Sequence, residues 1–305
     1  MHQLNFKIEG EFDGITLEKF LRNNKGMSSR TLKTLKHTEG GLKRNGEHIR
    51  SIDIIRTGDV ITLTFFDEPQ LIPSPDIPID IVYEDDDFIL CNKNGYMPTH
   101  PSLAHRDDSL ANAVSAYLAK SGHIQTVRII NRLDKGTSGL VLIAKHQLAA
   151  CAVSGKINKT YFALVEGELH GKGVIDKPIR REEPDGKRRI VADDGERAVT
   201  EYEAVESHNG TTLLKLNLIT GRTHQIRVHF SYIGHPLLGD KMYNPTANEE
   251  IDRQALHCGI IEWENPVRDK KKRCFAEFPE DILKPLKDLG YSFSIKGNNY
   301  DEEND

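Results

Sequence analysis

The sequence predicts a two-domain α+β protein, in which a small basic domain precedes a larger domain with a mixed, largely antiparallel sheet. Its 305 residues exceed the usual size of one domain. Residues 71–78 include three prolines, a composition typical of a stiff linker. Beyond this linker, strand patterns are interspersed with a few helices, a mixture typical of α+β domains. We therefore place the domains at residues 1–70 and 79–295, followed by an acidic, disordered tail at 296–305.

Two short helices are predicted near the start of the first domain. Apolar residues at helical spacing indicate a helix near residues 15–21. The pair Ser28-Ser29 has the chemistry of an N-cap and begins a second helix that continues to residue 36. In this second helix Leu32 and Leu35 face one way, and basic residues occupy another face.

Two turns and a strand complete the first domain. Asn45-Gly46 predicts a hairpin turn between short strands. Gly58-Asp59 predicts a further turn before residues 60–65, whose alternating pattern indicates a strand. The domain is therefore expected to combine two helices with a small strand unit.

The second domain is expected to consist mainly of strands. Helices are predicted at 109–120, near 146–156 and from Arg222 to about Ile233, with Ile226, Phe230 and Ile233 facing the core. Strands are predicted on both sides of the acidic turn at 84–87, and in the segments 139–145, 160–167, 198–207 and 211–219.

Positive charge is concentrated in the first domain, although the whole chain has a net charge of -5. Residues 15–66 contain ten Lys and Arg but five Asp and Glu, which is a local excess of 10 − 5 = +5. Such an asymmetry is typical of a surface that meets phosphates, although a solvated basic helix would have the same pattern. The candidate contacts are Arg30, Lys33, Lys36, Lys43 and Arg44.

Several other classes of protein are disfavoured. No run of about 18 apolar residues and no signal pattern is present, so we expect a cytoplasmic protein that does not cross a membrane. The four cysteines are widely spaced and are expected to be buried free thiols. The five-residue separation of His224 and His229 places them on different faces of a helix, so we expect no metal site there.

The most informative segment is NRLDKGTSGLVLIAK, at residues 131–145. Arg132 and Asp134 precede a turn rich in Gly, Ser and Thr, and this turn leads into a buried strand. Spacing alone does not single out Asp134, because an Arg two residues from an Asp usually forms a surface ion pair that adds little stability.

The motif RLDxxTSGL in this segment resembles the signature of the RluA/RluD family of RNA pseudouridine synthases. The resemblance implies that Asp134 is the catalytic residue. It extends over about residues 80–280 through KTYFALVEG, ITGRTHQIRVH and GHPLLGD. It implies that Tyr161 stacks on the target base and that Arg227 pairs with Asp134. Residues 15–66 are similar to the S-four-like RNA-binding domain, which often precedes the catalytic domain in this family.

The resemblance implies an enzyme that isomerises uridine to pseudouridine in structured RNA. Large-subunit ribosomal RNA is the expected substrate and transfer RNA the second candidate. Arg132 is expected to fill the space left by an extruded uridine and to contact phosphate. No organic cofactor or metal is required, because no redox or group-transfer step occurs. We expect a monomer.

Three residues depart from the family pattern, namely Asn94, Asn131 and Gly136. They leave the nucleophile in place and bear on the choice of substrate. Two alternatives remain open at this point. One is an RNA-binding or ribosome-assembly protein that has lost turnover, and the other is a nucleoside hydrolase. Retention of Arg132, Asp134, Tyr161 and Arg227 together argues against the first.

Overall fold

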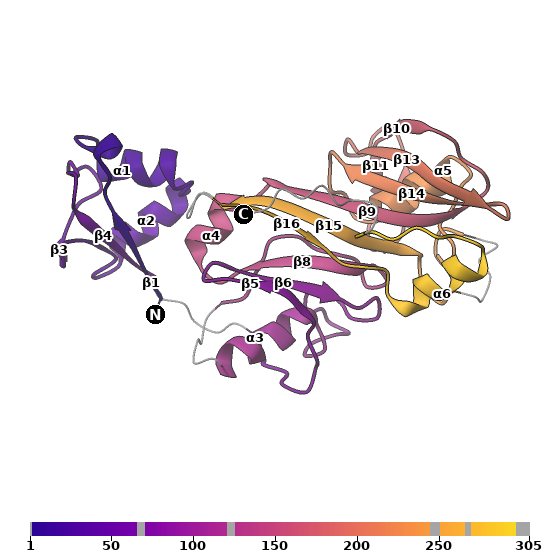
Figure 1. Ribbon diagram of the computed structural model, residues 1–305, viewed down its shortest axis with the longest axis horizontal. Coiled ribbons are helices and arrows are strands. Elements are labelled where there is room, and N and C mark those ends of the chain that lie inside the picture. The colour runs from indigo at the N-terminus through magenta and orange to yellow at the C-terminus, as the bar shows by residue number, and fades with distance from the viewer. Residues whose placement is uncertain (1, 66–70, 121–125, 245–250, 266–269, 297–305) are drawn as a thin grey trace.

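A computed structural model of the chain describes residues 2–65, 71–120, 126–244, 251–265 and 270–296. It consists of a small N-terminal unit beside a longer domain built on one large sheet (Figure 1). The predicted α+β class is therefore confirmed. Within the described ranges no helix is long and apolar enough to span a bilayer.

The N-terminal unit is a four-stranded sheet covered by short helices. Its helical elements are η1 (Gly10–Phe12), α1 (Leu17–Lys19), the π-helical turn η2 (Phe20–Asn24) and α2 (Ser29–His37). Its strands, in spatial order, are β1 (His2–Lys7), β4 (Val60–Phe65), β2 (Leu42–Arg44) and β3 (Glu47–His48). Strand β1 was not among the predicted elements and pairs antiparallel with β4.

The local signals in this unit acted as predicted. The Ser28 hydroxyl accepts a hydrogen bond from the N–H of Thr31 (3.1 Å) and so caps α2. Asn45 and Gly46 both have positive φ, at 53° and 89°, as the tight turn between β2 and β3 requires. Leu32 and Leu35 are buried in the core of the unit.

The second domain is organised around a ten-stranded sheet with the order β10-β13-β14-β9-β15-β8-β6-β5; in addition, β16 pairs with β15 and β7 pairs with β8. Its strand pairs are antiparallel except for β15 with β8. The strands are β5 (Ile81–Glu84), β6 (Phe88–Lys93), β7 (Arg128–Ile129), β8 (Ser138–Ala144), β9 (Ile157–Glu166), β10 (Lys172–Asp176), β13 (Val199–His208), β14 (Thr211–Leu218), β15 (Leu256–Asn265) and β16 (Lys270–Phe275).

A separate hairpin and four helices complete this domain. The hairpin joins β11 (Ile179–Arg181) to β12 (Arg189–Val191). The helices are α3 (Leu110–Lys120), α4 (Gln147–Val153), α5 (Gln225–Tyr232) and α6 (Glu280–Asp288). The predicted helices and strands thus have counterparts, although several boundaries differ. Strand β9 begins at Ile157 and not at residue 160, and α4 ends at Val153 and not near residue 156.

Helix α5 begins later than predicted. The N–H of Arg222 donates to the Gln225 side chain (2.9 Å), and His224 adopts a left-handed conformation with φ of 59°. These two features end the preceding turn, so the helix begins at Gln225 and not at Arg222. Ile226 and Phe230 are buried as expected, and Ile233 is partly buried.

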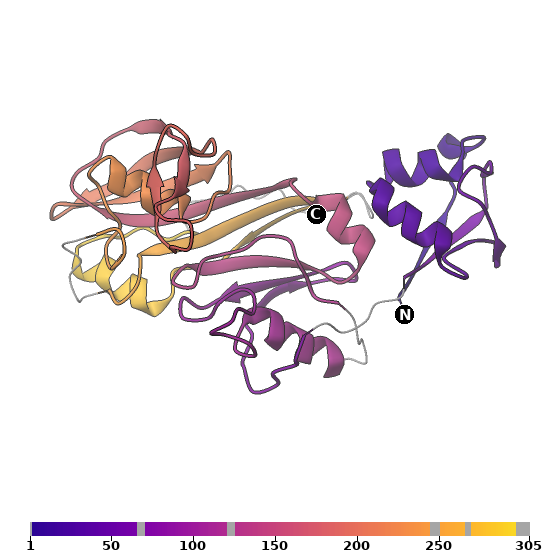
Figure 2. The ribbon, with the colours of Figure 1, turned by 180° about the vertical axis from the view of Figure 1, so that it is seen from behind.

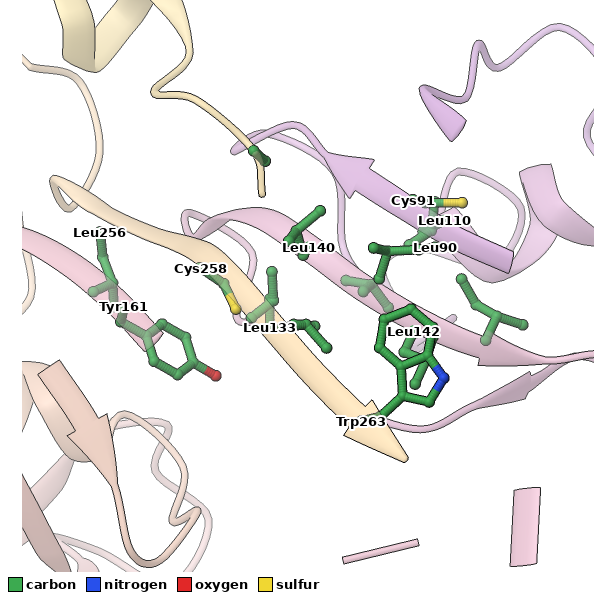
Figure 3. Packing of buried hydrophobic residues seen from close by; sticks show 14 of the residues in the cluster. Leu90, Cys91, Leu110, Leu133, Leu140, Leu142, Tyr161, Leu256, Cys258 and Trp263 are labelled. Atoms are coloured by element: carbon green, nitrogen blue, oxygen red, sulfur yellow. The ribbon is translucent and has the colours of Figure 1, made fainter. Parts of the chain in front are cut away.

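The main core lies between the sheet and its covering helices. Trp263, Leu142 and Leu90 pack together in it, and Tyr161 lies at the end of the cluster near Cys258 (Figure 3). The expectation that the cysteines would be buried is wrong for Cys151 and Cys274, which are half-buried, whereas all four are free thiols.

Helix α4 of the second domain packs against the N-terminal unit, and both views show it beside α2 (Figures 1 and 2). Its residues Leu148 and Ala152 are buried in the core of the N-terminal unit. The Thr31 hydroxyl also lies 3.1 Å from the sulfur of Cys151. The N-terminal unit therefore has a packed contact with the second domain.

The proline-rich segment 71–78 is attached to the second domain. The N–H of Ser74 donates to the carbonyl of Asn112 (3.2 Å), whose side-chain amide donates to the carbonyl of Ile72 (2.8 Å). The domain boundaries at 70 and 78 stay a prediction. The predicted disordered tail falls, from residue 297 onward, outside the described residues.

Candidate active site

The loop that carries Asp134 is clamped on both sides. The Thr99 hydroxyl donates to the carbonyl of Leu133 (2.6 Å) and accepts from its N–H (3.2 Å). The N–H of Thr137 then donates to the carbonyl of Asp134 (3.0 Å) and closes a turn into β8. The Asp134 side chain is 32% exposed, so it is fixed by its backbone and open to a ligand.

Two of the departures from the family pattern support this loop. The Asn131 amide accepts from the N–H of Leu142 (2.8 Å) and donates to the carbonyl of Leu140 (3.1 Å), which fastens the loop to β8. Gly136 has φ of 128°, and a Cβ at this position would lie 2.2 Å from the Gln254 side chain. Glycine is therefore required here for both backbone conformation and space.

Arg227 has a closer partner than the sequence implied. Its guanidinium forms two hydrogen bonds of 2.7 Å with the Asp240 carboxylate, and both side chains are buried. Its Nη1 lies 3.8 Å from Oδ2 of Asp134. The expected pairing of Arg227 with Asp134 is therefore the secondary contact. Sequence reasoning missed Asp240, one of 46 acidic residues, although it lies in the GHPLLGD motif.

His224 was considered in the sequence only as a metal ligand, and the structure places it beside Asp134. Its Nε2 lies 3.8 Å from Oδ2 of Asp134, and its Nδ1 lies 2.8 Å from the Tyr243 hydroxyl. That hydroxyl also accepts a bond from the N–H of Arg189 (2.8 Å). A backbone N–H can only donate, so the tyrosine hydrogen is free to point to Nδ1 of His224.

The state of His224 follows from its burial. Burial lowers the pKa of His224, which favours the neutral ring near pH 7. With Nδ1 accepting from Tyr243, the remaining ring hydrogen lies on Nε2 and faces Asp134. Its neighbour in the sequence motif, His229, lies elsewhere and bonds Thr200 (2.9 Å). In the portion of the chain that the structure describes, no cluster of three metal-ligating side chains occurs.

Lys93 is a second residue that the sequence did not single out. It is almost fully buried and donates to the carbonyls of Asn94 and Met97 at 2.8 Å. Burial lowers the pKa of Lys93 to about 7, and the charge of Asp134 opposes this shift. The Asn94 side chain, the third departure, accepts from the N–H groups of Tyr96 and Met97 (3.0 Å each).

Two cavities meet at Asp134. The smaller, of about 300 Å³, is lined by Tyr161, Arg132, Lys159 and Ile226. We call it the uridine cavity, after the substrate that the sequence resemblance implies. The larger, of about 640 Å³, lies on the other side of Asp134 and reaches the β11–β12 hairpin; we call it the hairpin cavity.

Tyr161 and Arg132 both line the smaller cavity. Tyr161 comes from β9, is 5% exposed, and its burial raises the pKa of its hydroxyl well above the ordinary value. Arg132 is exposed at the mouth of the uridine cavity. The structure thus brings Asp134, Tyr161, Arg132 and Arg227 around one cavity.

The remaining candidate RNA contacts lie on the N-terminal unit. Arg30, Lys33 and Lys36 are exposed on α2, whereas Lys43 and Arg44 are half-buried on β2. Lys36 pairs with Glu18 (3.1 Å), and Arg44 donates to the carbonyl of Ile54 (3.2 Å). Their role in RNA binding stays a prediction.

Known proteins are similar to this chain in sequence and in fold. The RNA pseudouridylate synthase family profile matches residues 87–232. The uncharacterized RNA pseudouridine synthase YjbO of Bacillus subtilis is 37% identical over 86% of this chain and 95% of its own. Ribosomal large subunit pseudouridine synthase D of Vibrio cholerae is 34% identical over 80% and 82%.

Solved structures support the same fold. Human RNA pseudouridylate synthase domain containing 1 aligns with a TM-score of 0.58 at 23% identity, over 73% of this chain and 91% of its own. Fold, cavity and sequence together define an RNA-modifying isomerase of the pseudouridine synthase class. The chain belongs to the RluA/RluD family of RNA pseudouridine synthases.

Proposed function

We propose that Asp134 is the catalytic carboxylate that converts a uridine of large-subunit ribosomal RNA to pseudouridine. The observation that supports it is the place of Asp134, on the wall of the uridine cavity that also contains Tyr161. The enzymes named for the large ribosomal subunit that resemble this chain support the choice of RNA. Action as a monomer in the cytoplasm is part of the same proposal.

The reaction breaks the bond between uracil N1 and ribose C1′ and forms a bond between C5 and C1′. Asp134 either attacks C1′ or removes a ribose proton to give a glycal, and both routes use the same carboxylate. After the base has turned and C5 has joined C1′, the proton on C5 leaves and N1 is protonated. Substrate and product are isomers, so the atoms balance without an oxidant or a group donor.

The surroundings of Asp134 suit either route. Asp240 is the closer partner of Arg227, so the guanidinium orients Asp134 through the longer of its two ion pairs, at 3.8 Å. His224 offers a neutral donor at the same distance. Both groups face Oδ2, and we assign the other oxygen, Oδ1, to the substrate.

Recognition of the base falls to Tyr161, and extrusion of the uridine to Arg132. An aromatic face contributes about 1 to 3 kcal/mol per stacked base. A paired or stacked uridine must leave its helix to reach the cavity, and Arg132 at its mouth can contact the phosphates and occupy the vacated space.

Mapping of pseudouridines in cells that lack this protein tests the proposal. We expect one or more sites in large-subunit ribosomal RNA to remain uridine, and the purified protein to restore them in the extracted RNA. The Asp176→Asn protein, altered in an exposed ion pair with Arg197, is the matched control and should restore them equally. Loss of sites in transfer RNA alone would refute the choice of substrate.

A further inference from the structure

The hairpin cavity shares Asp134 with the uridine cavity and has about twice its volume, and the proposal above gives no role to the part that the β11–β12 hairpin lines. Its wall includes Arg181 and Arg189 from the β11–β12 hairpin, and Tyr96 from the loop after β6. The cavity therefore combines guanidinium groups and an aromatic ring, the two kinds of group that bind single-stranded nucleic acid.

The two arginines of this wall face each other. Arg181 and Arg189 are direct partners in the register of β11 with β12. Like charges opposite each other on neighbouring strands destabilise a sheet. An anion between or above them would remove this cost, and the phosphodiester of an RNA strand is such an anion.

The same hairpin carries two further arginines, Arg180 and Arg188, which differ from Arg181 and Arg189 in having acidic partners. Arg180 pairs with Asp194 (2.8 Å) and Arg188 with Glu182 (3.8 Å). Among the described residues, Arg181 and Arg189 have no carboxylate within ion-pair distance, and their side chains donate to backbone carbonyls such as that of Pro184. In the described part of the hairpin, the arginines that line the cavity are thus the ones that form no ion pair.

The aromatic ring is held at the rim of the cavity. Tyr96 is 56% exposed, which is unusual for a large aromatic side chain. The Asn94 side chain fixes the turn that presents it, by accepting from the N–H of Tyr96 (3.0 Å).

A chain of contacts joins the β11–β12 hairpin to Asp134. The backbone N–H of Arg189 bonds the Tyr243 hydroxyl, which contacts His224, which in turn faces Asp134. A strand whose target uridine occupies the uridine cavity would therefore continue into the hairpin cavity with its next nucleotide.

We propose that the hairpin cavity binds the nucleotide adjacent to the target uridine, with its base on Tyr96 and its phosphate between Arg181 and Arg189. This inference rests on the proposed function and adds a requirement to it. The neighbour of the target must also be unpaired, so the enzyme recognises at least two consecutive extruded or single-stranded nucleotides.

Binding of a fluorescein-labelled oligouridine of about ten nucleotides, a length within the site size of single-strand binders, tests the base contact. Tyr96→Phe should bind like the parent. Tyr96→Ala should bind about five- to 150-fold more weakly, as expected for one stacked base. The control is Tyr232→Ala, because Tyr232 is equally exposed at 55% but does not line either cavity, and it should bind like the parent.

The salt dependence of the same binding tests the phosphate contact. Arg181→Gln together with Arg189→Gln should lower the slope of log affinity against log salt by about 0.7, because the double variant no longer neutralises the one phosphate that lies between these side chains. The double variant Arg180→Gln and Arg188→Gln should keep the parent slope, because carboxylates already neutralise these side chains.

These outcomes are separable from failure of the proposed function. If the parent forms no pseudouridine, the proposed function fails. The binding assays do not depend on turnover, so they still test whether the hairpin cavity binds a nucleotide. If the parent is active but Tyr96→Ala binds normally, or if the paired arginines matter as much as the cavity arginines, the inference is overturned. Failure of the parent to bind the oligouridine also overturns it.

Discussion

Substitution of Asp240 by Asn removes the charge that neutralises Arg227 while keeping the size of the side chain. Both carboxylate oxygens of Asp240 accept from Arg227 at 2.7 Å, and Oδ1 also accepts from the N–H of Met242 (3.1 Å). The Asp240 side chain is 0% exposed and that of Arg227 is 8% exposed. Removal of one partner from such a pair leaves a buried charge and costs about 3 to 5 kcal/mol.

The same change should also affect catalysis. Without the charge of Asp240, the guanidinium is free to shorten its 3.8 Å ion pair with Asp134. The carboxylate would then be a weaker nucleophile, so kcat should fall while RNA affinity changes little. Asp240→Glu keeps the charge and should retain more of both stability and activity.

Urea unfolding and tritium release from RNA labelled at uridine C5 measure the two effects. Asp176→Asn is the control, since Asp176 forms an exposed pair with Arg197 that solvent screens. It should unfold at the same urea concentration as the parent. If Asp240→Asn were as stable and as active as this control, our assignment of Asp240 as the partner that tunes Arg227 would be refuted.

Three further predictions follow from the site and the core. Tyr161→Phe should bind RNA normally, and should release tritium from C5 slowly if the hydroxyl accepts that proton, whereas Tyr161→Leu should lose about 1 to 3 kcal/mol of binding in a titration. His224→Asn should preserve the left-handed backbone, which Asn tolerates, and lower kcat with little change in KM, which steady-state kinetics would reveal. Burial lowers the pKa of His257 from 6.5 to about 4. Between pH 6.5 and pH 4, therefore, the imidazole of His257 is protonated in the unfolded chain but neutral in the folded protein. The stability due to His257 is complete above pH 6.5 and is lost toward pH 4, by about 3 kcal/mol, and urea unfolding of the parent and His257→Gln at pH 7.5 and 5 would detect it.

Much of the fold was predictable because its signals are local. The Ser28 cap, the Asn45-Gly46 turn and the alternating strands each depend on neighbouring residues in the chain. Strand β1 was missed because its pairing with β4 joins residues about sixty positions apart. The contact of α4 with the N-terminal unit was missed for the same reason.

The candidate site was predictable only where a motif identified it. Asp134, Tyr161 and Arg227 came from the family resemblance, and the structure places all three at the uridine cavity. Asp240 and His224 have the same local chemistry as many other residues, and they become distinctive only through burial and distance. A helical pattern also concealed the left-handed turn at His224, because periodicity carries no information on a single residue's φ.

The most direct test of the central claim is pseudouridine formation by Asp134→Asn. Asn has the shape of Asp but cannot act as a nucleophile or base, so we predict no pseudouridine and no release of tritium from C5. RNA affinity should stay within a few fold of the parent, and Asp176→Asn should remain active. Substantial turnover by purified Asp134→Asn would contradict the assignment of Asp134 as the catalytic residue.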